Sequence, residues 1–89
     1  MYIAKIVGVV VATTKKEGLV GKKMLIVQPL DTDYKSIGNI EVAIDSVGAG
    51  VGEIVLVSMG SSARQVFEEN NSPIDRAIVA IIDNIEVNS

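Results

Sequence analysis

One short segment of this chain combines residue types that could perform nucleophilic chemistry. Residues 60–64 read Gly-Ser-Ser-Ala-Arg and place two serine hydroxyls beside a glycine and a cation, as a serine nucleophile with an oxyanion hole would require. A serine nucleophile needs a general base, but the chain has no histidine, and no lysine stands at a spacing that would replace it. We therefore interpret the segment structurally. Gly60 ends a strand, and Ser62, three residues before Gln65, forms a capping box that begins a short helix.

A glycine-rich segment at residues 47–52 (VGAGVG) could cradle a phosphate. Dinucleotide-binding loops read Gly-x-Gly-x-x-Gly and open a helix, whereas Glu53 stands here in place of the last glycine and a strand-like run follows. The Gly-Lys-Ser/Thr ending of a P-loop is also missing. The pattern therefore favours a turn in which small residues allow close packing.

Charged side chains suggest one ion pair and one cation site. The planar guanidinium of Arg64 suits a carboxylate partner, and Asp45 or Glu53 could provide it within the same subunit or from a neighbouring one. An exposed arginine without a partner fits the spacing equally well. Asp31 and Asp33 provide too few carboxylates for a calcium loop, so we expect a solvated turn there.

The composition excludes most kinds of catalytic and metal site. The chain has no cysteine and no histidine, which removes disulfides, thiolate zinc sites, the usual general base and the commonest metal ligand. We therefore predict no enzyme activity, no catalytic residue, no metal and no cofactor. A net charge of −3 and only three aromatic residues argue against a nucleic-acid partner. The longest apolar run, residues 6–12, is far below the roughly 20 residues of a membrane helix, and no export signal is visible, so we expect a cytoplasmic protein without a membrane partner.

Valine and isoleucine dominate the apolar residues: the chain has 26 of them and only 4 leucines. Because β-branched side chains suit a pleated sheet, the sequence predicts a mainly β fold. Gly8 indicates a bulge in the first strand, and Pro29 should end the second because it has no N–H to donate. We predict strands at residues 2–14, 22–28, 40–46, 53–58 and 77–82, with one short α-helix at 61–69 before the last strand. These elements suggest one domain, residues 1–89, folded as a small, partly open five-stranded barrel.

The apolar content is large for so small a domain. Hydrophobic residues make up 48% of the chain, but a domain of this size buries only about two-thirds of the surface that its unfolded chain exposes. The surplus predicts a subunit interface and therefore a homo-oligomer. In the last predicted strand the apolar run is continuous, so Ile78, Val79, Ile81 and Ile82 should all be buried.

Four blocks of sequence follow one another and cover almost the whole chain: AKIVGVVVATTK at residues 4–15, LVGKKMLIVQPLD at 19–31, VAIDSVGAGVGEIVLVSMGSSAR at 42–64 and PIDRAIVAIID at 73–83. Together they resemble the vertex-protein family of bacterial microcompartments, the EutN/CcmL type. The most specific feature is the pairing of DSVGAGVGE with a GSSAR that follows closely. The resemblance implies a small OB-like β-barrel that assembles as a homopentamer and closes the fivefold corners of a polyhedral protein shell.

The resemblance also assigns roles to individual residues. Gly48, Ala49, Gly50, Gly52 and Glu53 match the family's glycine loop, Gly60, Ser61, Ser62, Ala63 and Arg64 match a second motif, and Pro73, Asp75 and Asp83 match a third. The first two motifs are expected at ring contacts or near the pore, where small residues let backbones crowd together. Implied partners are further copies and hexameric shell proteins of a carboxysome or metabolosome in the bacterial cytoplasm. The alternative is an OB-like binding module for single-stranded nucleic acid or another small ligand, which the negative charge and scarce aromatics disfavour.

Overall fold

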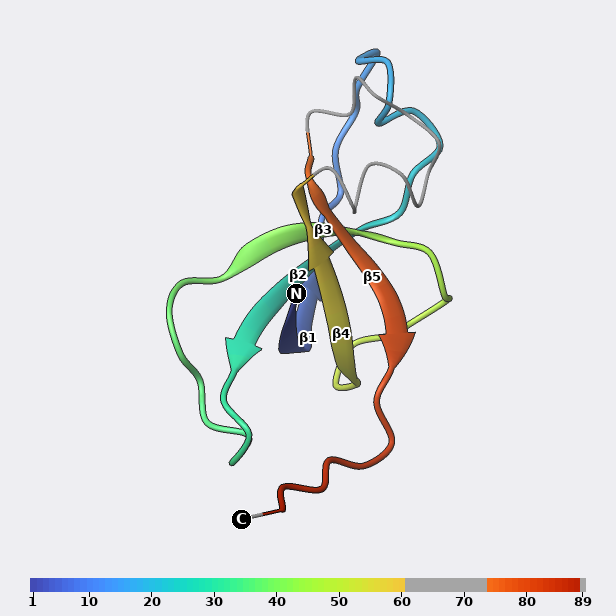
Figure 1. Cartoon of the computed structure of the whole chain (residues 1–89). Helices are drawn as coiled ribbons and strands as arrows, with labels where there is room; N and C mark the ends of the chain where they lie inside the picture. Colours follow the sequence, from blue (N-terminus) through green and yellow to red (C-terminus); the bar gives the residue numbers. More distant parts are fainter. Residues whose placement is uncertain (61–73, 89) are drawn as a thin grey trace.

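The computed structural model describes residues 1–60 and 74–88, whose strands form a small β-barrel (Figure 1). The strands are β1 (Tyr2–Val9), β2 (Met24–Leu30), β3 (Glu41–Asp45), β4 (Ile54–Met59) and β5 (Arg76–Ile81). They close in the order β1-β2-β3-β5-β4, with β3 and β5 parallel and all other neighbours antiparallel. The predicted five-stranded barrel is confirmed. The prediction of a partly open barrel is wrong, because β4 pairs with β1 and completes the circle. The helix predicted at residues 61–69 lies outside the described residues.

Small and β-branched side chains fill the barrel interior. The strand residues of the central core cluster are Ala4, Ile6, Leu25, Val27, Ala43, Val55, Val57 and Ile78. In β1 and β2 they alternate with more exposed residues, as the two-residue period of a strand requires. The bulge predicted at Gly8 is confirmed by a shift of register against β2. A Cβ atom at Gly8 would lie 3.3 Å from Cδ1 of Ile26, so the glycine permits a close approach of the two strands.

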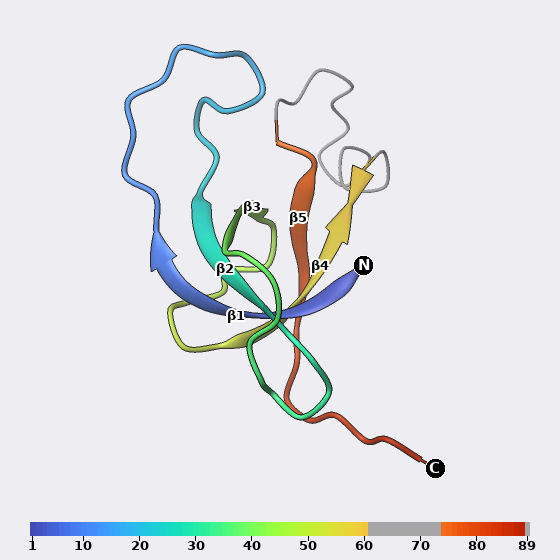
Figure 2. The same cartoon turned by 90° about the vertical axis from the view of Figure 1, so that its left-hand side faces the viewer.

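The first strand is shorter than predicted, since β1 ends at Val9 instead of residue 14. The amide of Val10 donates a last ladder hydrogen bond to the carbonyl of Met24 (3.0 Å), and the chain then leaves the barrel. Val11 is 95% exposed. An apolar run continues as a strand only where a partner strand accompanies it, and β2 begins at Met24. Residues 10–23 therefore form a long loop that projects away from the strands (Figure 2).

Pro29 lies within β2 and does not end it, so the prediction that it terminates the second strand is wrong. It pairs with Ala4 of β1. Its carbonyl accepts a hydrogen bond from the amide of Ile37 (2.9 Å), on the side of the strand away from β1. β2 has no strand partner on that side at Pro29, since its pairing with β3 ends at Val27. The missing N–H therefore costs no ladder hydrogen bond, as at the edge of a sheet.

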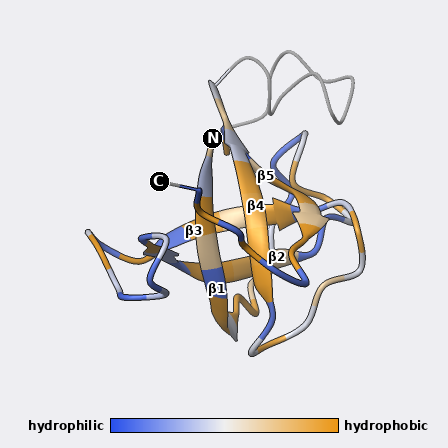
Figure 3. Cartoon of the chain, turned by 60° about the horizontal axis from the view of Figure 1, so that its bottom comes forward, coloured by the Kyte–Doolittle hydropathy of each residue, from blue (hydrophilic) through white to orange (hydrophobic). Residues whose placement is uncertain are grey.

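The last strand is less buried than its apolar run predicted. Ile78 is fully buried, but Val79 and Ile82 are only half-buried and Ile81 is 38% exposed in the single chain. β5 continues past its last pairing with β3 at Ile78, so its second half is covered by fewer neighbours. Most of β4 and β5 consists of hydrophobic residues (Figure 3), and Met59 at the end of β4 is 41% exposed. The surplus of apolar side chains expected from the composition thus appears on the surface of the single chain.

Candidate assembly surfaces

The glycine loop, residues 46–53 between β3 and β4, is held by the two carboxylates at its ends. Asp45 accepts hydrogen bonds from the amides of Val47 and Ala49, both at 3.0 Å. Glu53 accepts one from the amide of Gly50 at 2.7 Å. Three backbone donors of the loop are therefore satisfied by the chain's own side chains, which leaves them unavailable to a phosphate. This agrees with the interpretation of the segment as a packing loop.

The same loop is anchored to the barrel from both sides. The carbonyl of Ala49 accepts a hydrogen bond from Nζ of Lys23 (3.2 Å), and the Ala49 side chain is buried in the core. The backbones of Ile6 and the loop exchange two hydrogen bonds: the Ile6 amide donates to the Glu53 carbonyl (3.0 Å), and the Gly52 amide donates to the Ile6 carbonyl (2.8 Å). The loop is therefore part of the barrel's own structure.

Two glycines of the loop are required by backbone conformation and the third is not. Gly48 has φ of 79° and Gly52 has φ of 95°, a backbone conformation that residues with L side chains rarely adopt. Space is not the constraint at these two positions, because a Cβ atom on either would meet nothing within 4 Å. A Cβ on Gly50 would lie 3.5 Å from Oε1 of Glu53, which is an ordinary contact. Val51, at the tip, is 61% exposed. The loop thus presents an apolar side chain on a fixed backbone.

Only the first residue of the second motif is described. Gly60 directly follows β4 and has φ of 67°, and its amide donates to the carbonyl of Asp75 (2.8 Å), just before β5. Ser61, Ser62, Ala63, Arg64 and Pro73 lie outside the described residues, as do the capping box and any ion pair of Arg64. Both carboxylates considered as partners for Arg64, those of Asp45 and Glu53, bind amides of the glycine loop.

A polar cluster that the sequence did not predict joins three strands. The hydroxyl of Tyr2 donates to Oε2 of Glu41, and Nε of Arg76 donates to the same oxygen at 2.6 Å. Nη1 of Arg76 also donates to Oδ1 of Asp75 at 2.6 Å. Burial and the adjacent Glu41 raise the pKa of Tyr2, and the hydrogen bond to Glu41 raises the pKa of Arg76. At neutral pH the cluster therefore holds a protonated tyrosine and a charged arginine.

The strand order explains how this cluster forms. Tyr2, Glu41 and Arg76 are the first residues of β1, β3 and β5. These three strands run in the same sense, because β2 is antiparallel to both β1 and β3 and because β3 is parallel to β5. The starts of the strands therefore meet. The cluster depends on the strand order, which no local pattern in the sequence specifies.

Within residues 1–60 and 74–88, no group of three or more acidic, histidine or cysteine side chains is arranged to hold a metal ion. In the same residues no helix has the length and apolar character to cross a membrane.

Comparison with known proteins decides between a family of assembly subunits and a binding module. The family model described as "Ethanolamine utilisation protein EutN/carboxysome" matches residues 1–83. This chain belongs to the EutN/CcmL family. The shell vertex protein GrpN of Rhodospirillum rubrum is 49% identical to it over 97% of both chains. PduN, the shell vertex protein of Salmonella typhimurium, is 48% identical over 96% of this chain and 98% of its own.

Solved structures of the EutN/CcmL family share the same fold. The pentameric microcompartment shell protein GrpN from Rhodospirillum rubrum superposes with a TM-score of 0.88 and 48% identity, covering 99% of this chain and all of that one. CcmL of Nostoc sp. PCC 7120 gives a TM-score of 0.87 and 49% identity over 96% of this chain and 92% of its own. The resemblance found in the sequence is confirmed at the level of both family and fold.

Proposed function

We propose that this chain is a structural subunit of a bacterial microcompartment shell, which forms a homopentamer and caps the fivefold vertices. The observation that carries the proposal is the near full-length similarity to a pentameric shell protein, at 48% identity and a TM-score of 0.88. We propose further that residues 1–89 act as one vertex domain without enzymatic activity. Its partners are then its own copies and hexameric shell proteins in the bacterial cytoplasm.

The surface of the single chain supports assembly into a ring. Several large apolar residues on the outer side of the strands are exposed, namely Val7, Val9, Val42, Met59 and Ile81. Apolar surface that the single chain leaves uncovered is available for contacts between copies. A flat hexagonal layer cannot close on itself, and a ring of five copies with a heterologous interface is the geometric means of introducing a corner.

We place the ring contacts at the glycine loop and the second motif. The proposed interface residues are Gly48, Ala49, Gly50, Gly52, Glu53, Gly60, Ser61, Ser62 and Arg64. The exposed Val51 on a backbone held by Asp45 and Glu53 supports a contact there, because a fixed apolar side chain loses little conformational entropy on binding. Ala49 acts indirectly, since its side chain lies in the barrel core.

Native mass spectrometry tests the proposed ring. Five chains of 9.4 kDa should give a dominant species of about 47 kDa, as closed cyclic symmetry requires. The measurement should be made at neutral pH and moderate salt and repeated by sedimentation at several protein concentrations. A stable monomer, or a hexamer as the dominant species, would contradict the proposal.

A further inference from the structure

Positive charge is concentrated in one connection of this chain. The segment between β1 and β2, residues 10–23, is here called the basic loop; it contains Lys15, Lys16, Lys22 and Lys23 but only one acidic residue, Glu17. Half of the chain's eight Lys and Arg residues, and one of its eleven Asp and Glu residues, thus lie in this loop. The loop has a net charge of +3, whereas the rest of the chain has a net charge of −6.

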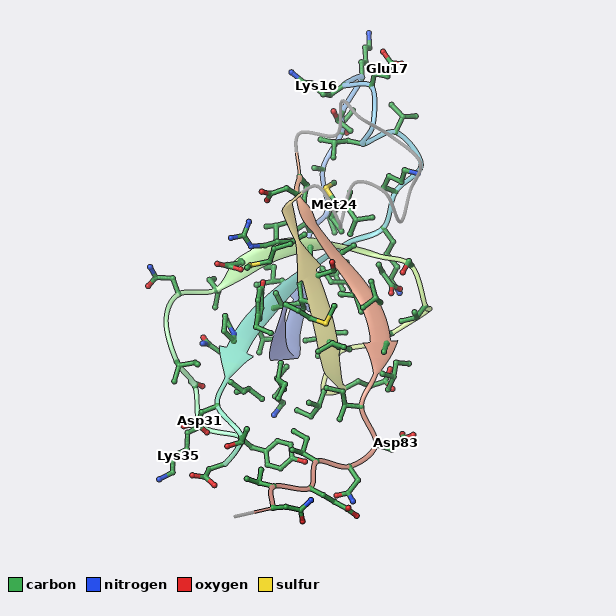
Figure 4. All side chains as sticks on the ribbon, in the orientation of Figure 1. Lys16, Glu17, Met24, Asp31, Lys35 and Asp83 are labelled. Carbon is green, nitrogen blue, oxygen red and sulfur yellow. The ribbon has the colours of Figure 1, made fainter. Side chains whose placement is uncertain are left out.

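The opposite end of the molecule has the complementary charge. Lys16 and Glu17 lie at one end, and Asp31, Lys35 and Asp83 lie at the other (Figure 4). The second end consists of residues 31–35 and 83–88 and is here called the acidic pole; it contains Asp31, Asp33, Asp83 and Glu86, with Lys35 as its one cation, for a net charge of −3. The two ends are far apart, because the molecule measures 46 × 24 × 22 Å.

Both ends have side chains exposed for a contact. Lys15 and Lys16 are exposed, and so are Asp33 and Asp83. The basic loop also carries Val11 and Val20, which are 95% and 62% exposed. Its tip is held by short-range bonds within the loop, such as the amide of Leu19 donating to the carbonyl of Lys16 (3.1 Å). Among the described residues, the side chains of Lys15 and Lys16 make no hydrogen bond or ion pair with the barrel.

We infer that the basic loop of one copy lies on the acidic pole of the next copy around the ring, an inference that rests on the proposed pentamer. A cyclic ring needs two different surfaces of the same chain that fit each other. The basic loop and the acidic pole are such a pair, with charges of +3 and −3. A two-fold contact between basic loops would instead place like charges together, which costs several kcal/mol. The charge distribution therefore selects head-to-tail closure over pairing of equivalent ends.

This contact has an expected dependence on salt. Charges at an exposed rim act mainly on the rate and specificity of association, and they are screened over a Debye length of about 10 Å at 0.1 M salt. The concentration at which the ring half-dissociates should therefore rise with ionic strength. Removing the charges from the loop should reduce this salt dependence.

Charge reversal in the full-length protein tests the contact. The variant Lys15→Glu/Lys16→Glu changes the loop from +3 to −1. Sedimentation at 50 and 500 mM NaCl should show at least a tenfold rise in its half-dissociation concentration at low salt. The control Lys5→Glu lies outside both the basic loop and the acidic pole. Compared with the single variant Lys15→Glu, which makes the same change in net charge within the loop, it should leave the ring unchanged. Circular dichroism should give the same strand content for all variants, because every substituted lysine is exposed.

Rescue by the opposite change identifies the partner surface. Asp83→Lys/Glu86→Lys turns the acidic pole from −3 to +1 and should weaken the ring by itself. Combined with the loop variant it should restore assembly to within about threefold of the wild type. If the loop variant assembles like the wild type, or if the combination fails to restore the ring, the inference is wrong. Both results leave the proposed function intact, whereas a wild-type protein that forms no pentamer would remove the proposed function itself.

Discussion

The glycine loop and the basic loop both connect consecutive strands, but they are held to the barrel in contrasting ways. Residues 46–53 have two carboxylates bound to three backbone amides, a lysine on the Ala49 carbonyl, and the Ala49 side chain in the core. Residues 10–23 are longer, and Val11 at the start of the loop is 95% exposed. Lys23, the last residue of the basic loop, also donates a hydrogen bond from Nζ to the Ala49 carbonyl of the glycine loop.

The contrast shows that a motif shared with a family of assembly subunits can still serve the fold. The backbone of the glycine loop is fixed by contacts within one chain, so the ring contact proposed for it would involve a side chain that it presents outward, such as Val51. In the basic loop, by contrast, Lys15 and Lys16 are exposed and can meet a partner. Variants of the two loops should therefore differ in whether they change folding or assembly.

The largest expected effect is on the stability of the fold, and it should distinguish two positions of the glycine loop that are two residues apart. Ala49→Asp places a carboxylate in the barrel core and should lower the free energy of unfolding by several kcal/mol, against a total of about 5–15 kcal/mol for a domain. The matched variant Val51→Asp changes an exposed side chain and should keep the wild-type melting temperature of the subunit. Thermal unfolding followed by circular dichroism measures both.

A stable Ala49→Asp protein would show that this loop is not part of the core. Val51→Asp supplies the second half of the comparison: its subunits should fold normally but form fewer rings in sedimentation. If Val51→Asp assembles like the wild type, the outward side of the loop does not lie at the ring contact.

The sequence indicated the strands better than their connections. Runs of β-branched residues located β3, β4 and β5 to within one residue at each end, because such side chains suit a pleated sheet. The same residue types extended the predicted first strand to residue 14, although β1 ends at Val9, since residue type does not reveal where the partner strand begins. Closure of the barrel depends on the pairing of β4 with β1, which no local pattern specifies.

The candidate site could be found in the sequence only as a motif, without its internal bonds. Asp45 and Glu53 were considered as partners for an arginine, yet they bind amides two to four residues away. An Asp before a glycine-rich turn commonly accepts such bonds, so this role could have been predicted for Asp45. The contact between Tyr2 and Glu41 could not, because these residues are 39 positions apart and meet only through the strand order.

A moderate effect on the free energy of unfolding should distinguish two glycines of the glycine loop. Gly48→Ala places a Cβ at φ of 79° and should cost about 1–2 kcal/mol in the free energy of unfolding. Gly50→Ala meets only an ordinary contact at 3.5 Å and should leave that free energy within about 0.5 kcal/mol of the wild type. Urea denaturation measures both values. If Gly50→Ala instead reduces ring formation without loss of stability, Gly50 lies where a neighbouring subunit leaves no room for a side chain.

The smallest effect is expected for a change of length in the basic loop. Two glycines inserted between Lys16 and Glu17 lengthen a loop of residues 10–23 whose ends are already fixed by the β1–β2 ladder. The added closure entropy scales with the logarithm of loop length and amounts to about 0.1 kcal/mol. The urea midpoint of the subunit should therefore stay at the wild-type value.

The matched variant has the same two glycines inserted between Gly50 and Val51. This insertion separates the Gly50 amide from Glu53, which it contacts at 2.7 Å, and disturbs the position of the buried Ala49. That insertion should lower the midpoint clearly, because a satisfied amide and a core contact are both disturbed. Equal losses from the two insertions would mean that the basic loop is as much a part of the barrel as the glycine loop, and that its charges are not free to serve a neighbour.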